Sequence, residues 1–288
     1  MSADFLAAAA RHAELALDRF LPAADATPAR LHAAMRYSVL AGGKRLRPAL
    51  VLGACRAVGG SDDVAAPAMA AVECFHTYTL IHDDLPAMDD DDLRRGRPTC
   101  HKQFDEATAI LAGDALQALS FELAAMHGAA AVTCLARAGG SLGVVGGQQD
   151  DLDAEGRAVT GSAEDRALLE RIHRGKTAAL IRASCELGAL AAGASDAQRG
   201  ALAAYGEAIG LAFQIADDVL DATADAATLG KTPGKDAAQG KLTYVALCGL
   251  DGARTEAHRL LATALAALAP LQAPDLTALA RFVVERDR

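Results

Sequence analysis

Two clusters of aspartates could bind divalent cations and, through them, a polyanion. The first cluster places six aspartates within residues 83–92, directly after an apolar run, and Arg94, Arg95 and Arg97 follow at once. Oxygen ligands favour a hard cation such as Mg²⁺, which is bound by one or two carboxylates, by water and by substrate phosphates. A guanidinium group binds phosphate oxygens in a bidentate manner. This stretch therefore indicates a phosphate-rich substrate held by arginines and metal ions.

The second cluster, Asp217, Asp218 and Asp221, lies in an otherwise apolar segment. Asp217 and Asp221 are four residues apart and share one face of a helix. Three carboxylates on an apolar helix are costly unless a cation balances them. A solvated acidic loop would explain the first cluster taken alone, but two such clusters favour a metal site.

Further short motifs accompany these clusters. They are GGKRLRP (residues 42–48), DDLPAMD (83–89), LRRGRPT (93–99), GGQ (146–148), GKT (175–177), DDVLD (217–221) and a lysine-rich segment at 231–241. In this order the motifs resemble those of the trans-isoprenyl diphosphate synthases, the polyprenyl synthetase family. Within that family the chain is most similar to bacterial enzymes of the farnesyl diphosphate synthase type, and the similarity extends from the first expected helix to the last residues.

The resemblance implies a role for each motif. Metal ions, three Mg²⁺ per active site, would be held by the acidic residues Asp83, Asp84, Asp89, Asp217 and Asp221. Isopentenyl diphosphate would be held by the first basic set, Gly43, Lys44, Arg47, His76 and Arg95. The allylic diphosphate would be bound by the second basic set, Arg94, Lys176, Lys231 and Lys241. Oxygens of Thr177 and Gln214 would face the developing cation, and these two residues with Lys176 are the expected catalytic residues.

Product length is expected to depend on the helix that precedes the first aspartates. A chain anchored at Asp83 grows back along this helix, where each residue adds about 1.5 Å. Tyr78 and Thr79 lie five and four residues before Asp83, with Cys74 and Phe75 one turn deeper. A bulky ring at the fifth position resembles farnesyl-forming bacterial enzymes, so we expect growth to stop at fifteen carbons. An ordinary core role for Tyr78 is the alternative.

The implied reaction is the ionisation of dimethylallyl or geranyl diphosphate, attack by the double bond of isopentenyl diphosphate, and loss of a proton. A geranylgeranyl diphosphate synthase of the same family is the first alternative. A class I terpene cyclase normally lacks a second acidic motif and the GGKR motif, and a noncatalytic prenyltransferase subunit typically loses acidic motifs. A simple cation-binding protein would leave the paired arginines unexplained.

The elements that position these residues are expected to be helices, in a single all-α domain over residues 1–288. The fold class is an isoprenoid-synthase-type bundle of antiparallel helices around a central cavity. Helices are predicted at 2–20, 29–40, 48–58, 64–88, 107–126, 164–192, 198–222, 242–250, 253–268 and 275–285, with a polar loop at 91–106. Hydrophobic residues make up 52% of the chain, which is sufficient for a sizeable core.

Two local breaks are expected within these helices. An ideal helix would place Asp83 and Asp89 about 240° apart, and Pro86 disfavours regular helix there. We therefore expect a bulge that brings Asp89 back beside Asp83. The GKT motif lacks the spacing of a phosphate-binding P-loop, and it is expected to interrupt the helix at 164–192.

Composition narrows the classes of partner. The net charge of −9 argues against nucleic-acid binding, because a phosphate backbone requires a basic face. Charged residues recur through the first twenty positions, unlike a secretory signal, and no uninterrupted apolar run reaches the roughly 18 residues that a membrane span needs. We expect a cytoplasmic protein without a membrane partner, and the resemblance implies a homodimer.

Overall fold

The computed structural model describes residues 2–223 and 242–285. Within the described part, every element is helical except one two-stranded hairpin, so the predicted all-α class is confirmed. The contacts divide the chain into two compact units. One contains residues 3–135 and 187–193, and the other contains the described residues of 136–186 and 194–285. That the whole chain is a single domain stays a prediction.

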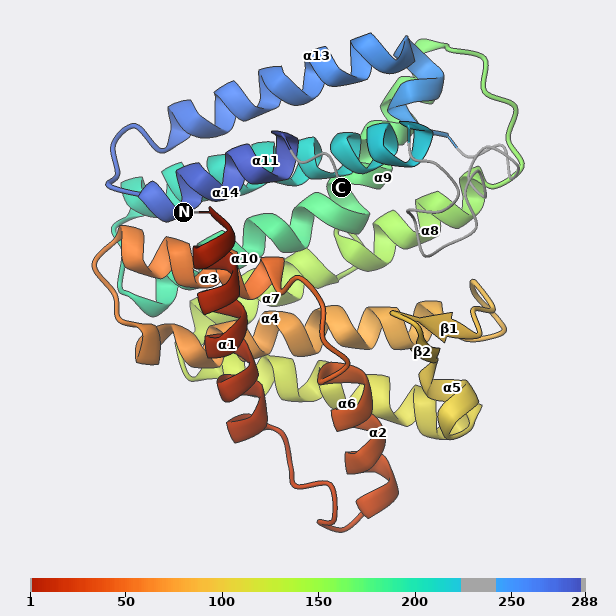
Figure 1. The fold of residues 1–288 in the computed structure, drawn as a ribbon, viewed down its shortest axis with the longest axis vertical. Helices are drawn as coiled ribbons and strands as arrows, with labels where there is room; N and C mark the ends of the chain where they lie inside the picture. The colour runs from red at the N-terminus through yellow and green to blue at the C-terminus, as the bar shows by residue number, and fades with distance from the viewer. Residues whose placement is uncertain (1, 224–241, 286–288) are drawn as a thin grey trace. The chain divides into compact units, whose positions relative to one another are not determined.

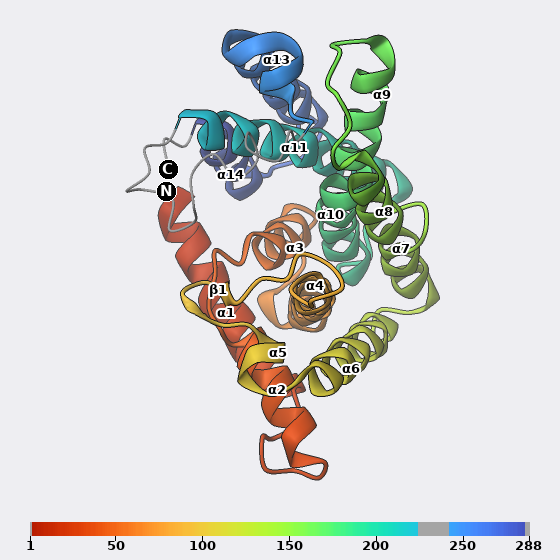
Figure 2. The same ribbon diagram turned by 90° about the vertical axis from the view of Figure 1, so that its right-hand side faces the viewer.

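The first unit is built on three helices that run side by side. Its elements are α1 (Ser2–Phe20), α2 (Ala29–Val39), α3 (Leu46–Ala57), α4 (Asp62–Asp83), β1 (Leu93–Arg94), β2 (Arg97–Pro98), α5 (Cys100–Gln103) and α6 (Glu106–Ala125). Figure 2 shows α4 almost end-on, with α3 and α6 packed beside it. Because α4 is covered on several sides, most of its residues from Ala65 to Ile81 are buried. The core of this unit therefore forms around the helix that ends in the first acidic cluster.

Apolar residues at every fourth position form the buried face of α1. Phe5, Ala9, Ala13 and Leu17 recur every four residues and are at most 7% exposed, as expected for one helical stripe. Leu15 is also apolar, but it is 71% exposed. It is two residues from Leu17, which places it about 200° away around the helix.

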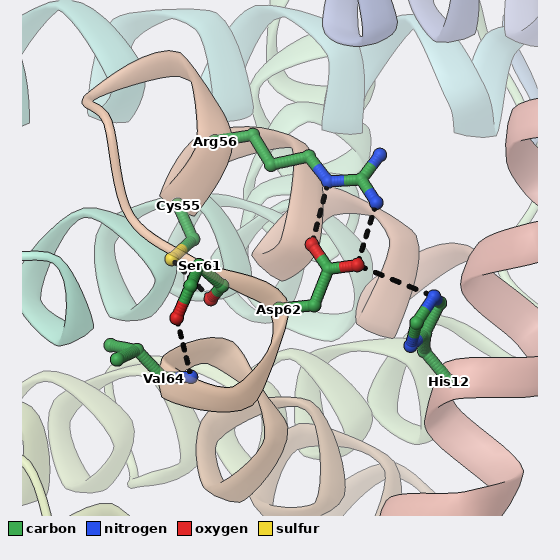
Figure 3. A network of polar contacts seen from close by, with 6 residues as sticks. All are labelled: His12, Cys55, Arg56, Ser61, Asp62 and Val64. Atoms are coloured by element: carbon green, nitrogen blue, oxygen red, sulfur yellow. Dashed lines mark hydrogen bonds and ion pairs between the residues drawn. The ribbon is translucent and has the colours of Figure 1, made fainter.

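A polar network fixes the start of α4 (Figure 3). The Ser61 hydroxyl accepts a hydrogen bond from the Val64 backbone N–H at 3.4 Å, as an N-cap residue does. Asp62 accepts two hydrogen bonds of 2.8 Å from Arg56 of α3, and His12 Nε2 of α1 lies 3.3 Å from its second oxygen. The Arg56 guanidinium holds the pKa of Asp62 below its usual value. The network links three helices of this unit at the end of α4 opposite the acidic cluster.

The second unit contains the other acidic cluster. Its elements are the end of α7 (Ala129–Gly139) and most of α10 (Ala179–Ala191), together with α8 (Val144–Ala154), α9 (Ala163–Ile172), η1 (His173–Ala178), α11 (Asp196–Thr223), α13 (Tyr244–Ala267) and α14 (Pro274–Glu285). In Figure 1, α13 and α14 run alongside α11. The Tyr205 hydroxyl of α11 donates a 2.8 Å hydrogen bond to the Leu276 carbonyl of α14. The core of this unit thus surrounds the helix that carries Asp217, Asp218 and Asp221.

The structure differs from the expected elements at several places, since α7 and α8 were not among the predicted helices and α4 and the polar loop also differ. Helix α4 ends at Asp83, five residues before the predicted end. The expected polar loop contains β1, β2 and the short helix α5, with Arg95 and Gly96 at positive φ in the hairpin turn. Such φ values at both central residues match the twist of a two-residue hairpin. The predicted break near residue 250 is confirmed, because Gly249 has a φ of 71° inside α13.

Among the residues that the structure describes, two stretches have the length and apolar composition of a membrane-spanning helix. One is α4, and 72% of its most apolar window is buried inside the protein, as in a core helix. The other, Ala129–Ala154, includes α7 and α8, and 28% of its window is buried. Its last turns carry Gln148 and a run of aspartates. Length and composition alone are weak support for a membrane span.

Candidate active site

The first acidic cluster lies on a turn that reverses the chain after α4. The backbone N–H of Asp89 donates a 2.8 Å hydrogen bond to the carbonyl of Asp83, and Asp90 follows with a φ of 48°. In a continuous helix that carbonyl would accept from residue 87, but Pro86 disrupts the ladder because its nitrogen cannot donate. The expected bulge is confirmed. It brings the two backbone positions together, so their carboxylates extend from the same turn.

Asp84 lies between these residues but has a different environment. It is 3% exposed, and Arg94 Nε lies 2.8 and 2.9 Å from its two oxygens, with Arg94 Nη2 at 2.5 Å. Burial raises the pKa of Asp84, and the hydrogen bonds from Arg94 oppose that rise. A metal ion at Asp84 would have to compete with this ion pair. Arg94, predicted to bind the allylic diphosphate, is therefore positioned by Asp84.

The GGKR motif and the hairpin turn meet within the first unit. Arg95 Nη1 donates a hydrogen bond to the Gly42 carbonyl. Gly43 has a φ of 122°, and a Cβ there would lie 2.7 Å from Arg95 Cζ. Glycine therefore serves two purposes at this position, because it adopts the backbone conformation freely and leaves room for the guanidinium. Lys44 is exposed beside them.

His76 lies close to several guanidinium groups. Burial lowers its pKa well below the usual value, and the positive charges of Arg47, Arg95, Arg94 and Arg45 lower it further. The imidazole is therefore neutral near pH 7, and it leaves the positive charge to the arginines. The structure thus brings Arg47 and Arg95, two charged members of the first basic set, together with His76.

A buried ion pair supports this set, and the sequence had not revealed it. Arg45 is 2% exposed with a φ of 48°, and its Nη1 lies 2.5 Å from Glu73 Oε1. Its Nη2 donates a 2.7 Å hydrogen bond to the Val39 carbonyl. Arg45 therefore anchors the GGKR loop to α4 and to the end of α2. The only sequence signal was a glutamate in the apolar part of α4, three residues before His76.

The two residues predicted to limit product length lie on different faces of α4. Tyr78 is 5% exposed, and its ring packs edge-on against Phe75 at 4.7 Å and His82 at 5.7 Å. Phe75 in turn contacts Phe121 of α6 at 6.0 Å. Thr79 is half-buried, and its hydroxyl donates a 2.8 Å hydrogen bond to the His76 carbonyl. Tyr78 therefore belongs to an aromatic cluster between α4 and α6.

In the second unit, the GKT motif forms a π-helical turn. Residues His173–Ala178 are η1, between α9 and α10, so the predicted interruption is confirmed. A Cβ on Gly147 would overlap the backbone nitrogen of Lys176, and one on Gly175 would lie 2.8 Å from Gly147 Cα. The glycines of GGQ and GKT therefore allow α8 and η1 to touch backbone to backbone. Such π-turns occur often at functional sites.

Lys176 and Thr177 both have partners on neighbouring helices. Lys176 Nζ lies 2.6 Å from Asp151 Oδ2 of α8. Thr177, 9% exposed, donates from Oγ1 to Gln214 Oε1 of α11 at 3.0 Å. The three predicted catalytic residues thus lie on two packed elements, η1 and α11, with Asp151 as the partner of the lysine.

The members of the second acidic cluster differ in environment. Asp217 is half-buried and Asp221 is exposed. Asp218 is 9% exposed, accepts a 2.9 Å hydrogen bond from the Tyr244 N–H, and lies 3.4 Å from Gln214 Nε2. Burial raises the pKa of Asp218 to about 7. Asp217 and Asp221 are four residues apart and therefore share a face of α11. This face is more exposed than the side that carries Asp218.

The donor set fits Mg²⁺ better than a softer metal. Within the described residues no three His, Cys, Asp or Glu side chains converge as a ready cation site. Mg²⁺ does not require one, because one or two carboxylates with substrate phosphates and water complete its shell. The turn at Asp83 and Asp89 and the helix face at Asp217 and Asp221 offer only oxygen donors. Lys231 and Lys241 lie outside the described residues.

A model of the polyprenyl synthetase family matches residues 28–275. The chain belongs to the polyprenyl synthetase family. It is 48% identical to farnesyl diphosphate synthase of Escherichia coli strain K12, over 98% of each chain. It is 47% identical to a chloroplastic geranylgeranyl pyrophosphate synthase of Catharanthus roseus, over 90% of this chain and 75% of that protein.

Solved structures of this family have the same fold. An apo structure from Zymomonas mobilis, described as an "FPP/GFPP synthase", superposes with a TM-score of 0.85 and 39% identity, over 99% of this chain and 100% of the other. The geranylgeranyl pyrophosphate synthetase of Pyrococcus horikoshii has a TM-score of 0.87 at 32% identity, over 98% of each chain. The isoprenoid-synthase-type helical fold is therefore confirmed, and the chain is a prenyltransferase.

Proposed function

We propose that the protein condenses isopentenyl diphosphate with dimethylallyl and then geranyl diphosphate to give farnesyl diphosphate. The observation that carries this proposal is the arrangement of residues 83–95 in the first unit. One turn presents the carboxylates of Asp83 and Asp89, while Arg94 and Arg95 of the next hairpin are held by different partners, Asp84 and Gly42. Because separate contacts position the guanidinium groups of Arg94 and Arg95, each group can bind a different diphosphate.

Asp83, Asp89, Asp217 and Asp221 are the proposed ligands of Mg²⁺, three ions per active site. When bound, these ions neutralise the charge that develops on the departing diphosphate. Asp84 is proposed to act through Arg94, because both of its oxygens face that guanidinium. This division leaves Asp83 and Asp89 in the first cluster and Asp217 and Asp221 in the second for the cations.

The protein's own side chains bind, orient and protect the reacting groups. Arg47, Arg95, Lys44 and neutral His76 hold isopentenyl diphosphate, with Gly43 leaving space beside Arg95. Arg94 and Lys176 hold the allylic diphosphate, and the resemblance adds Lys231 and Lys241. The oxygens of Thr177 and Gln214 stabilise positive charge on carbon through their dipoles.

No described side chain is an evident general base for the last step. We propose that an oxygen of the released diphosphate accepts the proton, as the resemblance implies. The apolar side chains of the core exclude water that would otherwise quench the cation. The enzyme is further proposed to be a homodimer in the cytoplasm.

A geranylgeranyl product is the second candidate, because the chain is nearly as similar to the Catharanthus enzyme as to the Escherichia one. The aromatic cluster of Phe75, Tyr78 and Phe121 favours the shorter product, since three rings fill the space between α4 and α6. Incubating the purified protein with isopentenyl diphosphate and each allylic primer, and sizing the products, tests the proposal. Mainly fifteen-carbon product is expected, and the absence of any condensation would reject it.

Arg47→Ala is expected to separate the two diphosphate subsites. It removes one cation from the group around His76, so KM for isopentenyl diphosphate should rise about tenfold or more, while KM for geranyl diphosphate should change by less than about threefold. Steady-state kinetics with each substrate varied in turn measures the split. Arg97→Ala is the matched control, because this guanidinium instead stacks on Tyr37 at 4.3 Å. Equal rises in both KM values would contradict the assignment.

Tyr78→Ala is expected to lengthen the product to twenty carbons or more. The ring is removed from a buried cluster, so a cavity opens beside Phe75 where a longer chain fits. Product sizing by chromatography measures the shift. Phe104→Ala is the control, because this ring packs on Tyr37, away from the cluster. If Tyr78→Ala folds and still stops at fifteen carbons, another part of the chain limits growth.

A further inference from the structure

Asp218 occupies a junction of three elements in the second unit. Its Oδ2 accepts a 2.9 Å hydrogen bond from the N–H of Tyr244, the first residue of α13, and lies 4.0 Å from His173 Nε2 of η1. Its Oδ1 lies 3.4 Å from Gln214 Nε2, one turn earlier on α11. The N–H groups at a helix start have no partner within the helix, so a carboxylate there also interacts favourably with the helix dipole.

The chemistry of the three side chains determines their orientation. An ionised carboxylate only accepts hydrogen bonds, whereas an amide has one donating and one accepting end. In the structure Gln214 Nε2 faces Asp218 and Oε1 faces Thr177, which is the orientation in which the carboxylate accepts. The single hydroxyl proton of Thr177 is then used in its 3.0 Å hydrogen bond to Oε1. The oxygens of Thr177 and Gln214 then offer only lone pairs to other contacts.

We propose that Asp218 is a positioning residue that, through Gln214, fixes the polarity of the Thr177 and Gln214 oxygens toward the developing allylic cation. The inference rests on the proposed function, in which these two oxygens face the cation. Without the Asp218 oxygen that accepts from Nε2, the amide of Gln214 can turn by 180°. The turned amide would direct N–H toward Thr177, and the Thr177 proton would become available to point at the cation. The dipoles of the Thr177 hydroxyl and the Gln214 amide, which stabilise the cation in the original orientation, would then destabilise it.

Asp218→Asn tests this polarity directly. The introduced asparagine still offers its amide oxygen to the Tyr244 N–H, but its amide nitrogen then faces Gln214 and favours the turned amide. We expect kcat to fall about a hundredfold, as for loss of one preorganised transition-state contact. KM for both diphosphates should stay within about threefold, because no diphosphate contact is changed. If Asp218 had a merely structural role, its substitution would lower the stability of the protein and would not lower kcat while leaving KM nearly unchanged.

The exchange variant Asp218→Asn with Gln214→Glu is the decisive control. It has the same net charge as the wild type, and the introduced glutamate accepts hydrogen bonds from both the introduced asparagine and Thr177, so the original polarity returns. We expect kcat to recover by about tenfold or more over Asp218→Asn, to about a tenth or more of the wild-type value.

A second readout is the binding of an allylic diphosphate analogue with a tertiary ammonium at the cationic carbon. Its Kd should rise by about tenfold or more in Asp218→Asn and recover in the exchange variant, because the oxygens of Thr177 and Gln214 would face the ammonium. Kd for inorganic diphosphate should stay constant in both variants, since inorganic diphosphate has no cationic carbon.

The outcomes separate this inference from the proposed function. Wild-type protein that makes no prenyl product rejects the proposed function. Active wild type with an unchanged kcat in folded Asp218→Asn overturns the inference, as does a folded exchange variant without recovery. If Asp218→Asn does not fold, the exchange variant decides, because it keeps every hydrogen bond. If circular dichroism shows that neither Asp218→Asn nor the exchange variant folds, Asp218 has a structural role, and the inference is also overturned.

Discussion

Asp83→Ala is expected to lower kcat by about a thousandfold or more and to leave the fold intact. The carboxylate is half-buried at the end of α4, so its removal creates no core cavity. It would remove a ligand from ions that neutralise the departing diphosphate, and a thousandfold loss corresponds to about 4 kcal/mol of transition-state stabilisation. Product formation at saturating Mg²⁺ and circular dichroism measure the two effects. Asp217→Ala should behave alike in the second cluster.

The acidic run itself provides the control. Asp92 belongs to the same run but is exposed, and it pairs with Lys102 at 2.8 Å. Asp92→Ala therefore removes the same formal charge from the same stretch without removing a proposed ligand. Its kcat is expected to stay within about threefold of wild type, since exposed ion pairs contribute little. Near-normal turnover of Asp83→Ala would remove that residue from the metal site, whereas equal losses in both variants would indicate a general charge effect.

Glu73→Gln is expected to lower the free energy of unfolding by about 3–5 kcal/mol, because it leaves the buried charge of Arg45 uncompensated. Both side chains of this pair are at most 3% exposed. Glu73 also offsets the repulsion between Arg45 and Arg95. Denaturant unfolding measures the change, and Tm should fall by on the order of 10 °C.

Two further variants test that explanation. Glu256→Gln is the matched control, because its partner Arg259, 2.7 Å away, is 60% exposed, and an exposed pair is worth at most about 1 kcal/mol. Replacing Arg45 by Met together with Glu73 by Leu removes both buried charges. This double variant should be more stable than Glu73→Gln alone. A double variant that is less stable would show that the pair contributes more than mutual neutralisation.

Several features of the fold followed from local sequence rules. The helix breaks at Pro86, at GKT and near Gly249 were predicted, because proline, glycine and polar motifs disturb the helical ladder within a few residues. The hairpin at 93–98 was missed, since two residues per strand give no alternating pattern.

Residue type and short spacing in the sequence predicted the two acidic clusters and the basic motifs, and the family resemblance added the roles of Thr177 and Gln214. Only the tertiary structure decided the partners of the charged groups. Asp84 pairs with Arg94 ten residues away, Glu73 with Arg45 across 28 positions, and Asp218 with the Tyr244 N–H across 26. Adjacent aspartates thus differ because burial and long-range partners, rather than local spacing, determine whether a carboxylate is available to a cation.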